Sequence, residues 1–386
     1  MLPPTRHFQL LWHDEWTEPG RLRHGSFDRD GMYIPCSLDI VSSAIVTMPR
    51  LTEITISCPF IPPQSLFEAV GQCRSLASFS LIDTPIDMGL VFVFPSRLSR
   101  VNLAPVGQCL RIGDGPTDPR VAELTYFMRD WRRKHRAQAQ IRGLREQRSC
   151  AIFLRQQTPS LTHLEISGDL CSFASLAALH WPDLRTLVLY GHIPGMQPPH
   201  AFLTPPPAAS IWDVLERMPV LNDLRLLFSR TKGKDFVLLP QEEVPHPTQL
   251  QKLASLTSFA ISNACILDGI FTHLTSLQKV AILALVDLPR WPIALSQAEA
   301  EHLISDIASS GCPLKHLRII IEDKLTPRTC HLIATLLPLL EVLEIERCGY
   351  HDGKSISTCV RALYLLPFPI HSSGRFHGPA CGGRGP

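Results

Sequence analysis

Histidine and cysteine are the side chains of this chain that could ligate a metal ion or act as nucleophile and base. The 386 residues include 16 His and 12 Cys, but no C-x-x-C pair, no H-E-x-x-H and no zinc-type Cys/His set. The nearest approaches are Cys330 beside His331, and Cys348 followed by His351. A phosphate-binding glycine loop and a G-x-S-x-G elbow are also absent from the sequence. The sequence therefore predicts no catalytic residue, no cofactor and no metal site, and it favours a protein that is not an enzyme.

A basic stretch between Arg129 and Arg148 could bind nucleic acid or act as a nuclear localisation signal. It holds eight Lys or Arg against one Asp and one Glu, and it lacks Pro, so we expect a helix. The candidate basic patch is Arg129, Arg132, Arg133, Lys134 and Arg136. The alternative is a solvated helix face, with Trp131, Ile141 and Leu144 packed on the rest of the protein. Over the whole chain, 37 basic residues balance 35 acidic ones, which favours this alternative; neither nucleic acid nor a membrane is the expected partner.

One six-residue string, Leu-x-x-apolar-x-apolar, recurs ten times. The elements that it forms must position any binding site. The copies begin at Leu51, Leu76, Leu98, Leu161, Leu184, Leu221, Leu256, Leu277, Leu314 and Leu340. Five of the nine spacings between them lie between 21 and 26 residues, within the range of leucine-rich repeats. The last two apolar residues stand two apart, as on one face of a short strand, and helix-like stretches precede most copies.

The repeats predict an α/β leucine-rich-repeat solenoid, curved as a horseshoe, with parallel strands on the concave face and helices outside. One strand–helix unit cannot bury its own apolar face, so neighbouring units must stack. An ordinary α/β domain is the alternative, but its alternation alone would not repeat one string ten times. The repeats are irregular: the ladder position after the strand, Asn or Cys in a consensus repeat, holds residues such as Thr84, Asp169 and His192.

The chain divides into four expected regions. Residues 1–47 lack the string and are expected to form an N-terminal cap or a remnant segment. The repeat domain covers 48–350 and includes the basic helical insertion at about 105–158. Residues 351–370 form an expected C-terminal cap, and 371–386 an expected disordered tail. Scattered cysteines and the lack of an apolar leader or a long apolar run lead us to expect a cytoplasmic or nuclear location.

The candidate binding surface consists of the strand residues that alternate with the buried pair, because these point outward on the concave face. Their mixed charge suits a protein partner better than a polyanion, and Arg and aromatic residues are the expected anchors. The alternative for each residue is an exposed position that contacts nothing. The candidate residues are Glu53, Arg100, His163, Glu165, Tyr190, Arg225, Arg318 and Glu344.

Residues from about 38 to 350 resemble the leucine-rich region of F-box-like proteins from basidiomycete fungi. Phrases such as Met48-Pro-Arg-Leu-Thr-Glu-Ile-Thr-Ile and Trp181-Pro-Asp-Leu-Arg-Thr-Leu-Val-Leu carry the resemblance, together with long Pro-rich loops. The resemblance implies a protein-recognition module, and a substrate receptor of an SCF-type ubiquitin ligase where an F-box binds the ligase adaptor. The F-box of such proteins is a helical segment that opens with Leu-Pro. Here Leu2-Pro3 is not followed by that helical pattern, so we expect either a fragment without the box or a member that has lost it.

Overall fold

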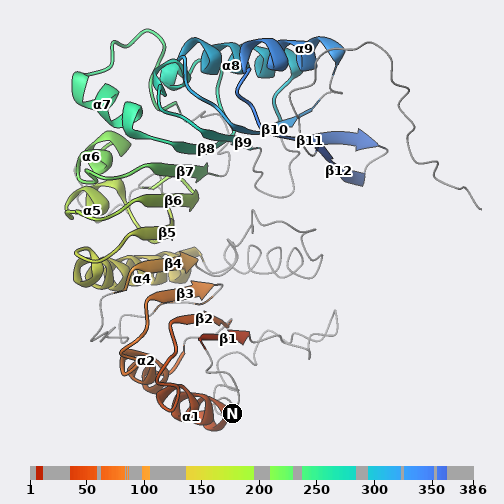
Figure 1. Ribbon diagram of the computed structural model, residues 1–386. Coiled ribbons are helices and arrows are strands. Elements are labelled where there is room, and N and C mark those ends of the chain that lie inside the picture. The colour runs from red at the N-terminus through yellow and green to blue at the C-terminus, as the bar shows by residue number, and fades with distance from the viewer. Residues whose placement is uncertain are drawn as a thin grey trace, which may run out of the picture.

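The structure is a computed structural model that describes residues 6–11, 35–58, 62–82, 84, 86, 98–104, 136–194, 209–228, 237–283, 294–322, 326–351 and 354–362. These residues form one twelve-stranded sheet in which the strands follow one another in chain order (Figure 1). Neighbouring strands are parallel from β1 to β11, while β12 runs antiparallel to β11. The fold is therefore the α/β leucine-rich-repeat solenoid that the repeated string predicts.

All ten copies of the string become strands, and each strand begins two residues after the leading leucine. The strands are β1 (His7–Leu11), β2 (Glu53–Ser57), β3 (Ser78–Ile82), β4 (Arg100–Ala104), β5 (His163–Ser167), β6 (Thr186–Gly191), β7 (Asp223–Phe228), β8 (Ser258–Ser262), β9 (Lys279–Leu283), β10 (His316–Ile321), β11 (Val342–His351) and β12 (Lys354–Ala362).

The helices lie on the outer side of the curved sheet, and the strands line its inner side (Figure 1). The helices are α1 (Pro35–Val46), α2 (Gln64–Gly71), α4 (Arg136–Gln157), α5 (Phe173–Ala177), α6 (Ile211–Glu216), α7 (Pro247–Ser255), the 3-10 helix η2 (Gly269–His273), α8 (Gln297–Ser309) and α9 (Pro327–Leu336). Among the described residues, no helix combines the length and the apolar character needed to cross a membrane.

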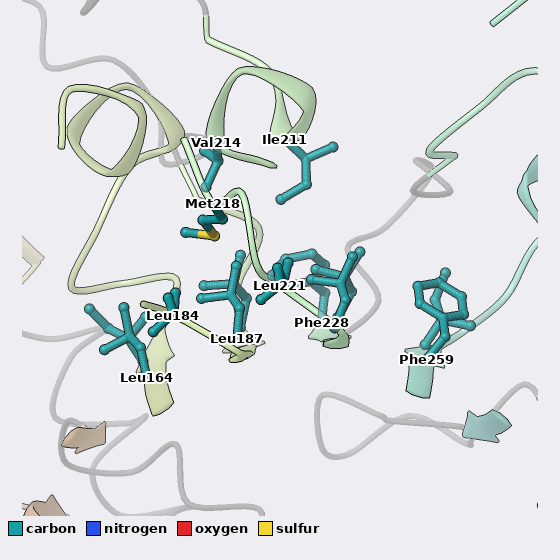
Figure 2. Packing of buried hydrophobic residues seen from close by; sticks show 14 of the residues in the cluster. Leu164, Leu184, Leu187, Ile211, Val214, Met218, Leu221, Phe228 and Phe259 are labelled. Atoms are coloured by element: carbon teal, nitrogen blue, oxygen red, sulfur yellow. The ribbon is translucent and has the colours of Figure 1, made fainter. Parts of the chain in front are cut away.

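The main core lies between the sheet and the helices. Leu164 and Leu187 point from β5 and β6 toward Val214 of α6 and Met218 just after it (Figure 2). These four side chains are fully buried. Burying such side chains contributes roughly 1.5–3 kcal/mol each, so the inward pair of every repeat stabilises the stack.

Backbone hydrogen bonds join each repeat to the one before it. At β5 the amides of Thr162 and His163 both donate to the carbonyl oxygen of Ser99, at 2.9 and 3.0 Å. At the start of every strand from β2 to β11, two consecutive backbone amides likewise donate to one carbonyl oxygen of the preceding repeat. Serine hydroxyls add to this contact, as where Ser160 donates to the carbonyl of Leu98 at 3.0 Å. These bonds set the strand register without any contribution from the loops.

The two ends of the sheet were not predicted as strands. β1 lies within the expected N-terminal cap and pairs in register with β2, so that Phe8 lies opposite Ile54. The Phe8 side chain packs against the main core. β12 lies in the expected C-terminal cap segment and pairs with β11 from Leu343 to His351. The expected tail, residues 371–386, lies outside the described residues.

We predict that Gly168→Ala destabilises the protein by about 1–3 kcal/mol. Gly168 follows β5, where two backbones meet, and its N–H donates to the carbonyl of Tyr190 at 2.8 Å. A Cβ at this position would stand 1.7 Å from the carbonyl oxygen of His192, and backbone cannot move aside as a flexible side chain can. The midpoint of urea unfolding measures the loss.

Gly143→Ala is the matched control for this substitution. Gly143 lies within α4, and a Cβ there would have nothing within 4 Å. Because alanine favours a helix over glycine, this variant should be neutral or up to about 1 kcal/mol more stable. Equal midpoints for the two variants would contradict the close approach at Gly168.

Candidate protein-binding surface

Two rows of outward-pointing side chains cross the concave face, and strand pairing aligns their members. The first row is His7, Glu53, Ser78, Arg100, His163, Thr186, Asp223, Ser258, Lys279, His316 and Val342. The second row is Gln9, Thr55, Ser80, Asn102, Glu165, Val188, Arg225, Ala260, Ala281, Arg318 and Glu344. With histidine neutral, the rows hold four cations (Arg100, Arg225, Lys279 and Arg318) and four anions (Glu53, Glu165, Asp223 and Glu344). Their formal charges cancel.

Ion pairs or, where histidine is neutral, uncharged polar contacts lie on both sides of the middle of this surface. The first is between β1 and β2, where Nδ1 of His7 lies 2.7 Å from Oε2 of Glu53. The second is within β7, where Nη2 and Nε of Arg225 donate to the two carboxylate oxygens of Asp223 at 2.7 and 3.1 Å. The hydrogen bonds that Arg225 donates to Asp223 raise the pKa of Arg225. This bidentate geometry holds the guanidinium in one orientation.

A third set of ion pairs lies on β10 and β11. Glu344 lies 3.5 Å from Nε2 of His316 and 3.7 Å from Nε of Arg318. Burial and the neighbouring Lys279 lower the pKa of His316. The candidate residues Arg318 and Glu344 are therefore brought together by the fold.

Between these ion pairs, five polar side chains on β3, β4 and β5 are unpaired. In the described part of the chain, no side-chain hydrogen bond or ion pair is made by Ser78, Arg100, Asn102, His163 or Glu165. We call this set the central patch. Arg100 is exposed, and the other four are partly buried. The sequence predicted Arg100, His163 and Glu165 as binding residues; it did not single out the neighbours Ser78 and Asn102 as members of the site.

Burial and neighbouring charges shift the pKa values of two members of the central patch, His163 and Glu165. Burial, together with the nearby Arg100 and Arg225, lowers the pKa of His163 to about 4, and Asp223 opposes this shift. Burial also raises the pKa of Glu165, while the same two arginines oppose that shift. His163 is therefore a neutral imidazole at neutral pH, with one N–H donor and one acceptor nitrogen.

Tyr190 differs from the exposed anchor that the sequence predicted. It lies two residues beyond Val188 of the second row, opposite Ser167 and Leu227. Only 8% of it is exposed, and its hydroxyl donates to the carbonyl of Leu103 at 2.8 Å. The ring belongs to a small apolar cluster with Leu227 and Ile320. The alternation of the strand placed Tyr190 on the correct face, but alternation does not determine exposure.

Sequence reasoning also missed a pair in the turns. Asp169 follows β5 and His192 follows β6, at the same ladder position of consecutive repeats. Nδ1 of His192 lies 3.1 Å from Oδ1 of Asp169, so the pair connects the two turns. The sequence signal that could have revealed this pair is an aspartate and a histidine at the same ladder position of adjacent repeats.

The basic stretch is only partly described. Helix α4 covers Arg136–Gln157, which agrees with a helical insertion, but residues 129–135 lie outside the described residues, as does the side chain of Arg136. The later Arg145 and Arg148 are exposed. The opposite side of α4 attaches to the solenoid, because Oε1 of Gln157 accepts the N–H of Leu98 at 3.0 Å. The candidate basic patch itself stays a prediction.

The described residues show no side-chain arrangement suited to metal binding, and the buried thiol of Cys150 is not activated. In that part of the chain, no three His, Cys, Asp or Glu side chains lie close enough to hold a metal ion. Cys330 and His331 are both exposed on α9. Burial raises the pKa of Cys150 to about 12, which makes it an inert thiol at neutral pH.

Comparison with known proteins adds little to this description. No family model matches the chain, and no curated protein matches it. Among solved structures, the chain is similar to the crystal structure of the Rad7 and Elc1 complex in yeast. The similarity covers 79% of this chain and 72% of that chain, with 11% sequence identity and a TM-score of 0.42. Values this low support no inference about a partner or an activity.

We predict that His163 makes the protein less stable in acid. Its folded pKa of about 4 lies below the ordinary value of 6.5, so as the pH falls the unfolded chain binds the proton first. The folding free energy that depends on neutral His163 is present above pH 6.5 and is lost progressively as the pH falls toward 4. Urea unfolding across this pH range should show a smaller loss in His163→Gln than in the unsubstituted protein. His331→Gln, at an exposed histidine of α9, is the control and should follow the unsubstituted protein. Parallel curves for all three proteins would contradict the effect.

Proposed function

We propose that the chain is a non-catalytic protein-recognition module that binds its partner through the two rows of the concave face. The charge balance of these rows carries the proposal. Four cations and four anions are distributed over the rows of eleven strands, with no net charge. A surface for nucleic acid needs a net positive charge to displace counterions from phosphates, whereas mixed charge suits the mixed surface of a protein.

The rigidity of the surface supports the same function. Solenoids present extended concave surfaces whose side chains stand at fixed spacing. In the rows, Asp223 orients Arg225, and Glu344 contacts both His316 and Arg318. Side chains that are already ordered lose less conformational entropy on binding than mobile ones. The concave face is thus suited to recognise one partner shape.

A finer proposal concerns the fate of the partner. The repeat strings resemble those of F-box-like proteins, so we propose substrate recognition for an SCF-type ubiquitin ligase in the cytoplasm or nucleus. Residues 48–350 would be the recognition unit, flanked by the terminal segments that contain β1 and β12. Recruitment to the ligase would require an adaptor-binding F-box upstream of the repeats.

We predict that reversing two exposed cations of the concave face abolishes partner binding. Arg100→Glu combined with Lys279→Glu changes one charge on β4 and one on β9 without touching a buried side chain. Proteins captured from a cell extract, quantified by mass spectrometry, should fall by about tenfold or more relative to the unsubstituted chain. The control is Arg155→Glu combined with Arg217→Glu, two exposed arginines on the helix side, which should retain them. Equal recovery with all three proteins would contradict concave-face recognition.

The ligase role makes a separate prediction. The purified chain should co-elute with the adaptor of a cullin–RING ubiquitin ligase in size-exclusion chromatography if it carries an adaptor-binding segment. Separate elution would remove the ligase role for this chain and leave partner recognition in place, because the adaptor and the partner would use different surfaces.

A further inference from the structure

We infer that the central patch is where the partner is recognised, and that it binds a polypeptide segment presenting one carboxylate next to exposed N–H donors. The central patch is Ser78, Arg100, Asn102, His163 and Glu165. The inference rests on the proposed function and names the chemistry of the partner at one place on the concave face.

The first argument is the lack of internal partners. Oγ of Ser78 and Oδ1 of Asn102 are buried, and neither makes a hydrogen bond within the described chain. Leaving one buried polar group unsatisfied costs about 1–3 kcal/mol, so buried polar groups in folded proteins are normally paired. To either side, Glu53 and Asp223 have partners, whereas Nε2 of His316 is a third buried atom without a hydrogen bond in the described chain. Rotation of either side chain of the central patch, Ser78 or Asn102, toward the surface would let an outside partner bond it and remove this cost.

The second argument is adjacency. Strand pairing places Ser78 beside Arg100 and Arg100 beside His163 in the first row. Asn102 lies beside Glu165 in the second row. Paired strands stand about 4.8 Å apart, so the five side chains border one small area that a single peptide segment can contact.

The third argument is the chemistry of the groups. Arg100 is an exposed guanidinium with no acidic partner in the described residues, and its planar fork matches a carboxylate. Asn102 Oδ1 and the Glu165 carboxylate are acceptors that require N–H donors, which a peptide backbone supplies. Arg225 lies close enough to influence Glu165, but its Nε and Nη2 atoms already donate to Asp223, which holds the guanidinium on that side. A polyanion would meet Glu165 and Asp223, so a peptide with a single carboxylate complements the patch better.

The test selects ligands for the full chain from a random-peptide library displayed on phage. Selected peptides should share an Asp or Glu, and their affinities are then measured by fluorescence anisotropy. Arg100→Ala, Asn102→Val and Glu165→Val should each weaken binding by about tenfold or more. Arg217→Ala removes an exposed arginine on the helix side, so it is the matched control and should change affinity less than twofold. Lys279→Ala is measured as well, because it probes the concave face away from the patch.

A stability measurement separates a binding role from a structural one. Val188 stands beside Glu165 in the second row, so valine suits this row. If the patch groups are kept for binding, Asn102→Val and Glu165→Val should unfold at a temperature equal to or roughly 2 °C above that of the unsubstituted chain. A fall in that temperature would mean that the groups stabilise the fold, and it would overturn the inference.

The outcomes distinguish this inference from the proposed function. If binding is lost in Lys279→Ala but retained in Asn102→Val and Glu165→Val, the concave face binds elsewhere and only the inference fails. If selected peptides bind every concave-face variant equally well, both fail. A selection that yields no peptide, or peptides without an acidic residue, overturns the inference.

Discussion

Two backbone amides that share one carbonyl oxygen hold every repeat against the repeat before it. This contact recurs at the start of ten successive strands, and it sets each strand level with its neighbour. Because the register is set there, the connections between strands can differ in length without moving the side chains of the sheet. The inward apolar pair of each repeat then meets the pairs on either side in one continuous core, and the outward residues form rows.

Some polar side chains of the two rows have hydrogen-bond or ionic partners within the described protein, and others have none. Toward the ends of the concave face and on β7, acidic and basic side chains pair within or between strands, and Tyr190 turns its hydroxyl to a backbone carbonyl. On β3 to β5, five polar side chains have no such partner in the described chain. Ser78 and Asn102 each bury a polar atom that makes no hydrogen bond in the described chain, and this destabilises the fold. We infer that a requirement other than folding keeps them there.

Some elements were predictable because their signal is local, and others were not. The ten strands follow from a string whose apolar residues must be buried two apart. β1 has the same alternation in His7–Leu11 but lacks the leading leucine, so only its pairing with β2 reveals it. Tyr190 was assigned to the correct face, but its burial depends on groups from other repeats, including Leu103, which is 87 residues away in the chain. The Asp169–His192 pair likewise depends on two turns being adjacent.

The repeat string alone therefore established the fold class, the strand positions and the face on which each strand side chain lies. These are properties of periods of two and of about 21 to 26 residues, which can be read along one chain. The tertiary structure alone decided which of those outward side chains are paired. Glu165 and Glu344 occupy the same position of the repeat string, but of these two only Glu344 makes an ion pair in the described chain, with Arg318 of the neighbouring strand. Pairing depends on which residues of adjacent repeats lie in register across the sheet, and on how far each side chain is buried. The sequence of a single strand determines neither of these.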